Sequence, residues 1–403
     1  MKILHLYPYL PAPPTFGGAL RIYHILKHLS EYHDVTVGGY SEHGDEKYFR
    51  REFPSLENKM HFIKRSHEKY RRLMQLYACF TSHSYWYQWS QSKAFERKLN
   101  ELLERQNFDF VISEFASMGH FELETDAIRI LDAHNVEYDN FRRMSKLNYS
   151  PIRRKYYERE FKRSFHEEVA AFKRHDAIFT TSARDGKLIQ KDAPKPAQFV
   201  IPNGVDTDFF QKGNTRSEPF TLVFTGSMRY VPNYDGMIYF IEEIFPEIKK
   251  EVPEAKIYIV GSGPPNILKK HQSDSVIITG FVDDVRPYID RASVFVVPLR
   301  MGSGTRLKVV EALSMQKPVV STSIGCEGID VENEKHLVIR DHPQAFAEAV
   351  LELFKAQKLR NRLISNGYEL VKNKYDWSVI GESIDEALHQ LQKKEEVGER
   401  VVK

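Results

Sequence analysis

The chain has 403 residues, of which 41% are hydrophobic and 28% charged, and its formal net charge is +3 at pH 7. This length exceeds one ordinary hydrophobic core and favours two domains, and the composition is that of a soluble globular protein. So small a net charge gives no support to a nucleic-acid partner. Two cysteines far apart, Cys79 and Cys326, make no disulfide framework, which favours a reducing, cytoplasmic setting.

The amino terminus carries no recognisable targeting segment. Its short apolar run has one charge, Lys2, and is broken by Pro8, which is unlike a signal peptide. No stretch approaches the roughly 20 apolar residues of a membrane-spanning helix. We therefore expect a cytoplasmic protein, with peripheral contact at the inner face of the membrane as an open alternative.

The first half of the chain alternates between expected strands and helices. A strand at Ile3–Leu6 precedes a proline-rich loop ending at Gly17 and Gly18, and Ala19–Leu29 has the apolar spacing of a helix. Further strands are expected at Val35–Val37, Phe108–Ser113, Ile128–Asp132 and Ala177–Thr180. Strands alternating with helices predict a parallel, doubly wound sheet.

A second series of the same kind begins at residue 201, after which a hinge rich in Pro, Gly, Asn and Asp is expected up to Gly213. Its strands are expected at Thr221–Thr225, Lys256–Val260, Val276–Thr279, Ser293–Val297, Val319–Ser321 and Leu337–Ile339. The clearest helical patterns are Tyr239–Lys250, Ala345–Lys355 and the tail Leu363–Leu391.

The fold prediction is therefore α/β, with two doubly wound, Rossmann-like domains facing each other across a cleft. The first domain covers residues 1–200 and the second residues 201–375. A carboxyl-terminal helix at about 376–403 is expected to pack back on the first domain. Ligands of such sheets bind at the carboxyl ends of the strands.

The strongest functional pattern runs from Gly302 to Glu311, between two expected strands. Its glycines and Thr305 lead into a short helix, whose amino terminus favours an anion. The cations Arg306 and Lys308 follow, and Glu311 can accept hydrogen bonds from sugar hydroxyls. The pattern predicts a site for a nucleotide diphosphate that carries a sugar. The alternative is an ordinary loop with solvated charges.

Two motifs of the first domain also lie next to expected strands. Gly17 and Gly18 are either a backbone platform facing the cleft or a tight turn. His134 and Asn135 follow the strand Ile128–Asp132, where active residues of an open α/β sheet are expected. A lone histidine at such a place is more often a structural residue.

Two loops of the second domain complete the expected donor site. Gly280, Phe281 and Val282 can hold a base by backbone contacts and stacking, or the loop can simply cap a helix through Asp283 or Asp284. Gly226 follows the first strand of this domain, and Arg229 is close enough in sequence to reach a phosphate or to remain a solvated loop residue.

Basic residues gather in two segments of the first domain. They are Lys64, Arg65, Lys69, Arg71 and Arg72, and then Arg142, Arg143, Lys146, Arg153, Arg154, Lys155, Arg159, Lys162 and Arg163. They suit an anionic membrane or a polyanionic acceptor, or else a solvated helix face. The aromatic segment Tyr85–Trp89 either lines an acceptor groove or packs in the core.

No metal-binding pattern is found: HExxH and CxxC are absent, and no Asp-x-Asp follows a strand. We therefore predict a metal-independent site in which cationic side chains neutralise a leaving diphosphate.

Together, these motifs resemble those of the retaining glycosyltransferase family 4, which has the GT-B fold. The resemblance is carried by Ile201–Phe210, by Thr279–Val285, by the Gly302–Val320 block, and by Gly226-Ser227-Met228 with Pro232, Asn233, Asp235 and Gly236, the last being similar to a bacterial polysaccharide branch. It is dense from Ile201 to Ser323 and thin from Ser41 to Phe108.

The resemblance implies a hexosyltransferase that moves a sugar from a nucleotide diphosphate to a hydroxyl acceptor in polysaccharide or glycoconjugate synthesis. It assigns the donor diphosphate to Arg306 and Lys308, with Gly17 and Gly18 beside the phosphates, and the ribose to Glu311. It makes His134 the active-site histidine near the transferred sugar. The first domain binds the acceptor, and no cofactor is implied.

The same resemblance assigns the base to the Gly280–Val282 loop and favours a UDP-sugar over a GDP-sugar as donor. The acceptor is left open between a glycan, a lipid-linked molecule and a small molecule. One position departs from the family, because Ser303 stands where the family carries the first of two glutamates, which contacts the donor sugar. Arg229 stands in for a basic residue that the family carries directly after the glycine at the position of Gly226.

Three other classes of protein fit parts of the pattern. A sugar-nucleotide epimerase shares the fold, with His134 and Glu114 as candidate acid and base. A non-catalytic sugar-nucleotide-binding protein is suggested by Ser303. A dehydrogenase fits less well, since neither first strand–helix turn carries GxGxxG.

Overall fold

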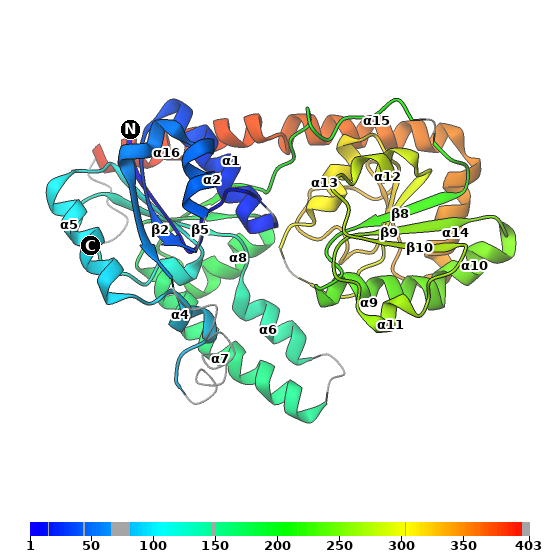
Figure 1. The fold of residues 1–403 in the computed structure, drawn as a ribbon, viewed down its shortest axis with the longest axis horizontal. Coiled ribbons are helices and arrows are strands. Elements are labelled where there is room, and N and C mark those ends of the chain that lie inside the picture. Colours follow the sequence, from blue (N-terminus) through cyan, green and yellow to red (C-terminus); the bar gives the residue numbers. More distant parts are fainter. Residues whose placement is uncertain are drawn as a thin grey trace. The chain divides into compact units, whose positions relative to one another are not determined.

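The computed structural model describes residues 1–14, 16–42, 45–65, 81–146, 150–215, 217–302 and 304–396. The chain divides into two compact units (Figure 1). The first contains Met1–Pro202 together with Gly381–Lys403, and the second contains Asn203–Ile380.

Within the described residues, the first unit is built on a seven-stranded sheet in the order β3-β2-β1-β4-β5-β6-β7, and every adjacent pair is parallel. Its strands are β1 (Lys2–Tyr7), β2 (Asp34–Ser41), β3 (Met60–Lys64), β4 (Phe110–Glu114), β5 (Ile128–Ala133), β6 (Ala177–Thr180) and β7 (Ala197–Val200).

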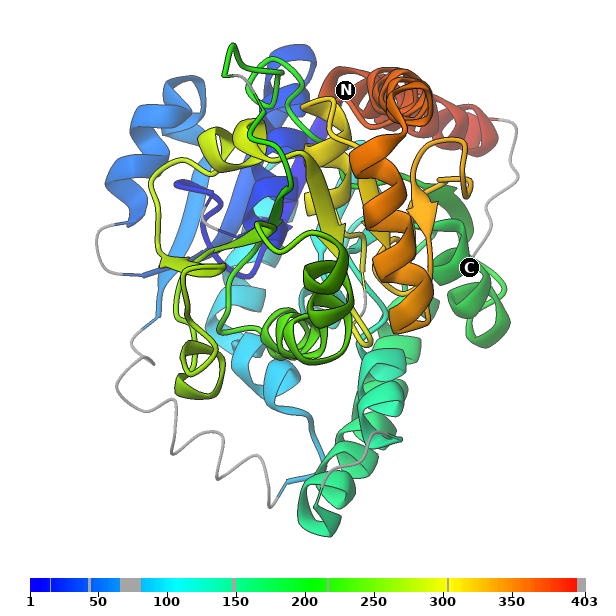
Figure 2. The same cartoon turned by 90° about the vertical axis from the view of Figure 1, so that its right-hand side faces the viewer.

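Helices connect these strands. They are α1 (Gly17–Tyr32), α2 (Asp45–Glu52), α4 (Tyr85–Ser90), α5 (Lys93–Arg105), α6 (Glu137–Ser145), α7 (Pro151–Lys173) and α8 (Ala183–Asp192), with the 3₁₀ turns η1 (Pro54–Lys59) and η3 (Ala116–Met118). Helices α6 and α7 lie side by side in both views (Figures 1 and 2).

The described part of the second unit holds a six-stranded parallel sheet in the order β10-β9-β8-β11-β12-β13. Its strands are β8 (Thr221–Thr225), β9 (Lys256–Val260), β10 (Val276–Gly280), β11 (Val294–Val297), β12 (Val319–Ser321) and β13 (Val338–Ile339). Its helices are α9 (Val231–Tyr239), the π-helical turn η4 (Phe240–Ile244), α10 (Phe245–Glu251), α11 (Asn266–Lys269), α12 (Arg286–Arg291), α13 (Leu307–Ser314), α14 (Pro343–Lys355), α15 (Gln357–Lys374) and the start of α16 (Trp377–Glu396).

Helices cover both faces of the second sheet, with α9 and α10 on one side and α12 and α13 on the other (Figure 1). This explains why strands such as β8 and β11 are apolar almost without interruption and fully buried, since neither face meets water. The prediction of two doubly wound parallel sheets is confirmed.

In each sheet the order in which successive strands are added reverses at one point. This point lies between β1 and β4 in the first sheet and between β8 and β11 in the second. At such a switch point the connections on either side run to opposite faces, which leaves a crevice at the carboxyl ends of the strands. The residues that follow β1, β4, β8 and β11 are therefore the ones best placed to bind ligands.

The strands β3 and β7, at the two edges of the first sheet, were not among the predicted strands. Most of their residues are only partly buried, so their apolar patterns are weak. An edge strand is paired on one side only and needs less apolar surface.

Two helix predictions were only partly right. The single helix expected at Tyr239–Lys250 contains the π-helical turn η4, because Pro246 has no N–H to donate to the preceding turn. The tail is two helices, interrupted at Tyr375 and Asp376. There the carbonyl of Tyr375 accepts a hydrogen bond from the N–H of Val205. The carboxylate of Asp376 accepts one from the N–H of Ser378, in the first turn of α16, at 2.9 Å.

The last helix, α16, begins in the second unit, and from Gly381 onward it belongs to the first. In the first unit, Asp385 lies 2.9 Å from His28 Nε2 and 2.8 Å from His33 Nε2, both at the end of α1. No helix in the described part of the chain is long and apolar enough to cross a membrane.

Candidate functional site

In the second unit, the structure gathers the predicted donor residues at one edge of the sheet. Gly226 follows β8, Gly280 ends β10, and Gly302 lies in the loop between β11 and α13. β8 and β11 are adjacent at the switch point, whereas β10 is the edge strand and is separated from β8 by β9. The carboxyl ends of all three strands lie along the same side of the sheet, because the strands are parallel. Ser303 lies outside the described residues.

Two glycines let the loops approach one another. At Gly226, where φ is 146°, a Cβ atom would lie 2.8 Å from both Asn233 Nδ2 and Lys308 Nζ. At Gly302, where φ is 129°, it would lie 2.9 Å from the guanidinium of Arg306. Both conformations disfavour other residues, and a side chain would displace a polar group of the site.

Lys308 points its ammonium group toward the end of β8. Its Nζ donates to Asn233 Oδ1 at 2.8 Å and lies 3.9 Å from the centre of the Phe224 ring. Burial, and after it the charge of Arg306, lowers the pKa of Lys308 to about 7, against the opposing effect of Glu311. An anion bound here would favour the charged ammonium, so Lys308 is prepared for a diphosphate.

Arg306 has a different setting from Lys308. Its side chain is buried, and its Nε and one terminal nitrogen donate to the carbonyls of Ile324 and Gly304, at 3.4 and 2.9 Å. Arg306 thus braces the glycine-rich loop from within. It also occupies the capping position of α13, where no side chain caps the helix. The N–H groups of Leu307 and Val309 donate to the carbonyls of Thr305 and Arg306, so it is the positive end of the helix dipole that faces a ligand here.

Glu311 lies one turn into α13, close to Lys308. Burial raises the pKa of Glu311 to about 7, and Lys308 acts in the opposite direction. Thr305 lies between Gly304 and Arg306 and accepts from the N–H of Leu307 at 3.2 Å. Glu311 and Thr305 therefore both belong to the same edge of the second unit as Lys308.

The loop after β10 is open on one side. Gly280 has φ of 73°, with no atom within 4 Å of where a Cβ would stand, and Phe281 is 75% exposed. Val282 is partly buried against the core. Further along, Asp284 accepts from the N–H of Arg286 at 2.9 Å. The N-cap of α12 is Val285, so the alternative of an N-cap at Asp283 or Asp284 is wrong.

Arg229 is exposed and lies over Gly263 in the loop after β9. A Cβ atom at Gly263 would come within 2.3 Å of Arg229 Cγ. This places Arg229 at the same edge as Gly226, where a guanidinium can reach a phosphate.

In the first unit, His134 belongs to a buried network at the ends of β1, β4 and β5. His134 Nε2 lies 2.5 Å from one oxygen of Glu114, and His5 Nε2 lies 2.5 Å from the other. The two imidazoles outweigh the opposing effect of burial and hold the pKa of Glu114 below its usual range. Because Glu114 is then a carboxylate, both histidines donate from Nε2, and His134 keeps Nδ1 for other contacts.

A buried ion pair between Arg21 and Asp132 adjoins this network. Arg21 of α1 holds Asp132 through two hydrogen bonds of 2.8 Å each, and it also donates to the carbonyl of Pro202 at 3.0 Å. Asp132 lies 3.8 Å from His134 Nε2. Both partners of the Arg21–Asp132 pair are buried, and together they fix the strand that leads to His134.

Glu114, Asp132 and His134 have ligand atoms within 4.8 Å of one another, close enough to suggest a metal site. The oxygens of both carboxylates are already used, by two imidazoles and by a bidentate guanidinium. A cation would have to displace Arg21, so this donor set fits an ion-pair network better than a metal site.

Gly17 and Gly18 are the first residues of α1 rather than the end of the preceding loop. At Gly18, a Cβ atom would lie 2.6 Å from the hydroxyl of Tyr9 and 3.0 Å from the ring of Phe115. A glycine at this position therefore lets α1 begin against the residues that surround His134.

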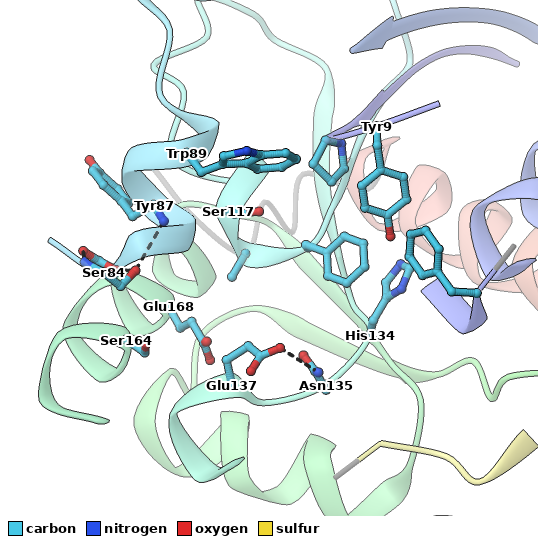
Figure 3. A pocket seen from close by; sticks show the side chains of 15 residues that line it. Tyr9, Ser84, Tyr87, Trp89, Ser117, His134, Asn135, Glu137, Ser164 and Glu168 are labelled. Atoms are coloured by element: carbon cyan, nitrogen blue, oxygen red, sulfur yellow. Dashed lines mark hydrogen bonds between the residues drawn. The ribbon is translucent and has the colours of Figure 1, made fainter. Parts of the chain in front are cut away.

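A pocket opens beside His134 (Figure 3). Aromatic side chains form much of its wall: Tyr9, Phe16, Tyr87, Trp89 and Phe115. Tyr87 and Trp89 come from the aromatic segment, so these two residues line a groove as one interpretation proposed. The ring of Phe115 lies 3.8 Å from that of His134, measured between centroids.

Carboxyl groups form the other side of this pocket. Glu137 begins α6 and accepts from Asn135 at 2.9 Å, while Glu168 comes from α7 (Figure 3). Burial raises the pKa of Glu137, and burial together with the nearby Glu137 raises the pKa of Glu168. The two groups therefore favour holding a proton between them, and they can exchange hydrogen bonds with hydroxyl groups.

Sequence reasoning did not select Arg21, Asp132, Glu137 or Glu168. Each lies in a helix or strand where a charged residue normally faces water. For Asp132 there was a signal, because a carboxylate in an otherwise apolar strand needs a partner. For Glu137 and Glu168 the sequence held no such signal, because 30 residues separate them and no local pattern shows that the two carboxyl groups are close.

The basic clusters are largely paired in the described residues. Arg142 and Arg143 both contact Asp139, and Arg163 contacts Glu160 at 2.9 Å. Arg65 stacks on Trp89 at 3.4 Å and donates to its carbonyl. Lys69, Arg71 and Arg72 lie outside the described residues. Several members on α7, such as Lys155 and Lys162, are exposed.

Residues 219–356 match the model of the family described as "Glycosyl transferases group 1". The second unit carries a glycosyl transferases group 1 domain. This domain contains all the donor residues predicted in the second unit, from Gly226 to Glu311. The alternatives of an epimerase and of a non-catalytic binding protein are not favoured by this match.

The chain is also similar to named proteins over longer stretches. The chain is 24% identical to the "Uncharacterized 44.6 kDa protein in cps region" of Klebsiella pneumoniae over 316 residues, which are 73% of this chain and 76% of that protein. It is 24% identical to the "Capsular polysaccharide biosynthesis glycosyltransferase CapM" of Staphylococcus aureus over 254 residues, 57% of this chain and 65% of that protein.

Among solved structures, Anabaena Alr3699/HepE in complex with UDP is similar over 97% of this chain and 100% of its own, with a TM-score of 0.69 and 14% identity. At this identity the likeness concerns the fold. The predicted GT-B fold of two Rossmann-like domains is confirmed.

Proposed function

We propose that the chain is a retaining glycosyltransferase of family 4 that moves a hexose from a nucleotide diphosphate to a hydroxyl acceptor, without a metal ion, in polysaccharide or glycoconjugate synthesis. The observation that carries the proposal is the convergence of Lys308, Gly226 and the uncapped start of α13 at the switch point of the second sheet. The capsular polysaccharide role of one relative supports the pathway class.

On the donor side, Lys308 and the positive end of the α13 dipole would hold the diphosphate, joined by Arg229. Arg306 would keep the Gly302–Thr305 loop in shape and add its charge. Glu311 would accept from the ribose, and the open loop at Gly280 would receive the base. A UDP-sugar is favoured over a GDP-sugar, and a structural neighbour with UDP bound fits this choice.

On the acceptor side, the aromatic pocket of the first unit would hold a sugar. Aromatic rings cover the apolar face of a sugar ring, and carboxyl groups accept from its hydroxyls. The hydroxyl of Tyr9 lies buried in this wall without a hydrogen-bond partner among the described residues. Such a group costs free energy until a ligand satisfies it.

The reaction breaks the bond between the anomeric carbon and the diphosphate and forms one bond from that carbon to the acceptor oxygen. The acceptor's proton would pass to the departing diphosphate. Lys308 and the helix dipole would stabilise the charge that develops on the leaving group. The role of His134 would be to contact the transferred sugar through Nδ1, its Nε2 being held by Glu114.

The proposal is tested by a thermal-shift panel of UDP-, GDP-, dTDP- and ADP-sugars, followed by product analysis. We expect a UDP-sugar to give the largest rise in melting temperature, since a ligand at 100 times its Kd stabilises by about 2.7 kcal/mol. With an acceptor present, proton NMR should show a product with the donor's anomeric configuration. An inverted product, or a new sugar formed without any acceptor, would overturn it.

For His134→Ala we expect kcat to fall about 100-fold, the lower range for loss of a group that acts on the transition state. Binding of UDP should be unchanged, because the donor loops lie in the other unit. Transfer rates and UDP calorimetry are the measurements. His61→Ala, on the edge strand β3, is the control. Full activity of His134→Ala would make this histidine structural.

We also propose that the protein acts in the cytoplasm, at the inner face of the membrane when its acceptor is lipid-linked. The exposed basic residues of α7 would supply that peripheral contact.

A further inference from the structure

A second cavity, of about 320 Å³, lies in the first unit next to the aromatic pocket. The two share Tyr87 of α4 and Glu167 of α7, which line both. A molecule that filled the aromatic pocket would therefore have this second cavity as its immediate neighbour. We call it the α7 cavity, because much of its lining, from Lys162 to Arg174, comes from that helix and its carboxyl-terminal cap.

The α7 cavity is positively charged, unlike the aromatic pocket. Lys162, Arg163 and Arg174 line it, whereas the lining of the aromatic pocket contains no lysine or arginine. Arg163 is paired with Glu160. Arg174 donates to the carbonyl of His120 at 2.9 Å, and no ion pair with a described carboxylate is found for it or for Lys162.

Glu167 is the carboxylate in this lining, and it is already engaged. It accepts from the N–H and the hydroxyl of Ser84 and lies 3.2 Å from His83 Nδ1. The ring of His83 stacks on that of Tyr87, with the planes 11° apart and the centroids separated by 4.6 Å. These contacts form the wall between the two pockets. Glu167 carries one negative charge at most, so it does not neutralise both Lys162 and Arg174.

His120 supplies an independent sign of a missing ligand. It lines the α7 cavity and is 8% exposed, and neither of its ring nitrogens meets the distance and angle of a hydrogen bond within the described residues. Burial lowers the pKa of His120 to about 4, although the backbone of Ser117 is close enough to raise this pKa slightly. At neutral pH His120 is therefore an uncharged imidazole with one N–H to donate. Buried polar groups nearly always have partners, and an anion's oxygen would serve as one here.

We propose that the α7 cavity binds an anionic group, a phosphate or a carboxylate, that is attached to the acceptor whose sugar occupies the aromatic pocket. The inference rests on the proposed function and narrows its acceptor to an anionic glycan or glycan phosphate. Lys162 and Arg174 provide the charge and His120 a directed donor. The lining of the aromatic pocket holds no lysine or arginine, so it offers the anion no partner of opposite charge.

The test is calorimetric titration of the full chain with glucose, glucose 1-phosphate and glucuronate. All titrations are made in an Arg306→Ala/Lys308→Met background, so that the proposed donor site contributes little. We expect one of the two anions to bind at least about 10-fold more tightly than glucose, since hydrogen bonds to charged groups are the strong ones. The better anion distinguishes a phosphorylated acceptor from a carboxylated one.

Adding Lys162→Ala/Arg174→Ala should remove this preference. The control pair, Lys155→Ala/Lys191→Ala, removes two exposed charges that do not line the cavity and should leave it intact. Because Arg174 also holds the carbonyl of His120, the exposed Lys162 is replaced alone as well, with a partial loss expected.

The proposal is overturned if glucose and both anions bind equally, or if the control pair causes the same loss as the cavity pair. These outcomes are independent of transfer activity. A protein that transfers no sugar but still prefers the anion would reject the proposed function alone. An active enzyme with no anion preference would reject the α7 cavity alone.

Discussion

Replacing Lys308 by methionine is expected to lower kcat about 100- to 1,000-fold, equivalent to about 2.7–4 kcal/mol of lost transition-state stabilisation. The methionine keeps the apolar stem over Phe224 but removes the ammonium that faces the end of β8. Folding should be little changed, because burial disfavours the charged form of Lys308, and the loss of that cost offsets the lost hydrogen bond to Asn233. Steady-state kinetics and a melting curve are the measurements.

The pH profile gives this prediction a second readout. Because the pKa of Lys308 is lowered to about 7, this side chain loses its charge in the free enzyme as the pH of the solution rises through that value. We therefore expect kcat/KM of the wild type to fall above about pH 7, and this limb to be absent in Lys308→Met. Lys269→Met, on the exposed side of α11, is the control. Near-normal transfer by Arg306→Ala/Lys308→Met would contradict the donor assignment.

The largest effect on stability is expected for Arg21→Ala. Arg21 and Asp132 are both buried, and removing the guanidinium leaves Asp132 without its two hydrogen bonds and close to Glu114. Breaking such a pair costs about 3–5 kcal/mol, because an unpaired charge remains inside. Urea denaturation followed by circular dichroism measures the loss.

Two variants separate this explanation from a general weakening of α1. Lys27→Ala removes an exposed charge from the same helix and should change stability by less than about 0.5 kcal/mol. Arg21→Lys keeps the charge but not the two-pronged geometry, and should lose an intermediate amount. A stability of Arg21→Ala close to that of Lys27→Ala would show that the pair contributes little.

Much of the fold followed from local patterns. Strands such as β6, β8, β9 and β12 were placed at their observed bounds because buried parallel strands are apolar runs between polar loops. The edge strands β3 and β7 were missed because their apolar signal is weak. The π-helical turn before Pro246 depends on which of two hydrogen-bonding patterns the backbone adopts within one helix. The spacing of apolar residues does not distinguish the two patterns.

The two sites differ in how far the sequence could reach. Lys308 and Glu311 were predicted because they share one continuous loop and helix, the Gly302–Glu311 pattern. The network around His134 is assembled from side chains distant in the chain: His5 and Glu114 are 109 residues apart, and Arg21 and Asp132 are 111 apart. No local pattern links such residues, so His134 was found without the partners that orient it.

The sequence by itself determined two parallel α/β sheets and the glycine-rich loop before α13, because apolar periodicity, glycines and helix starts are local properties of the chain. The tertiary structure alone decided which polar groups share a buried space. It turned Arg306 inward to its own loop, joined His134 to Glu114, and set the aromatic pocket beside the α7 cavity. Burial sets the free energy of those groups, and burial is a property of the packed chain.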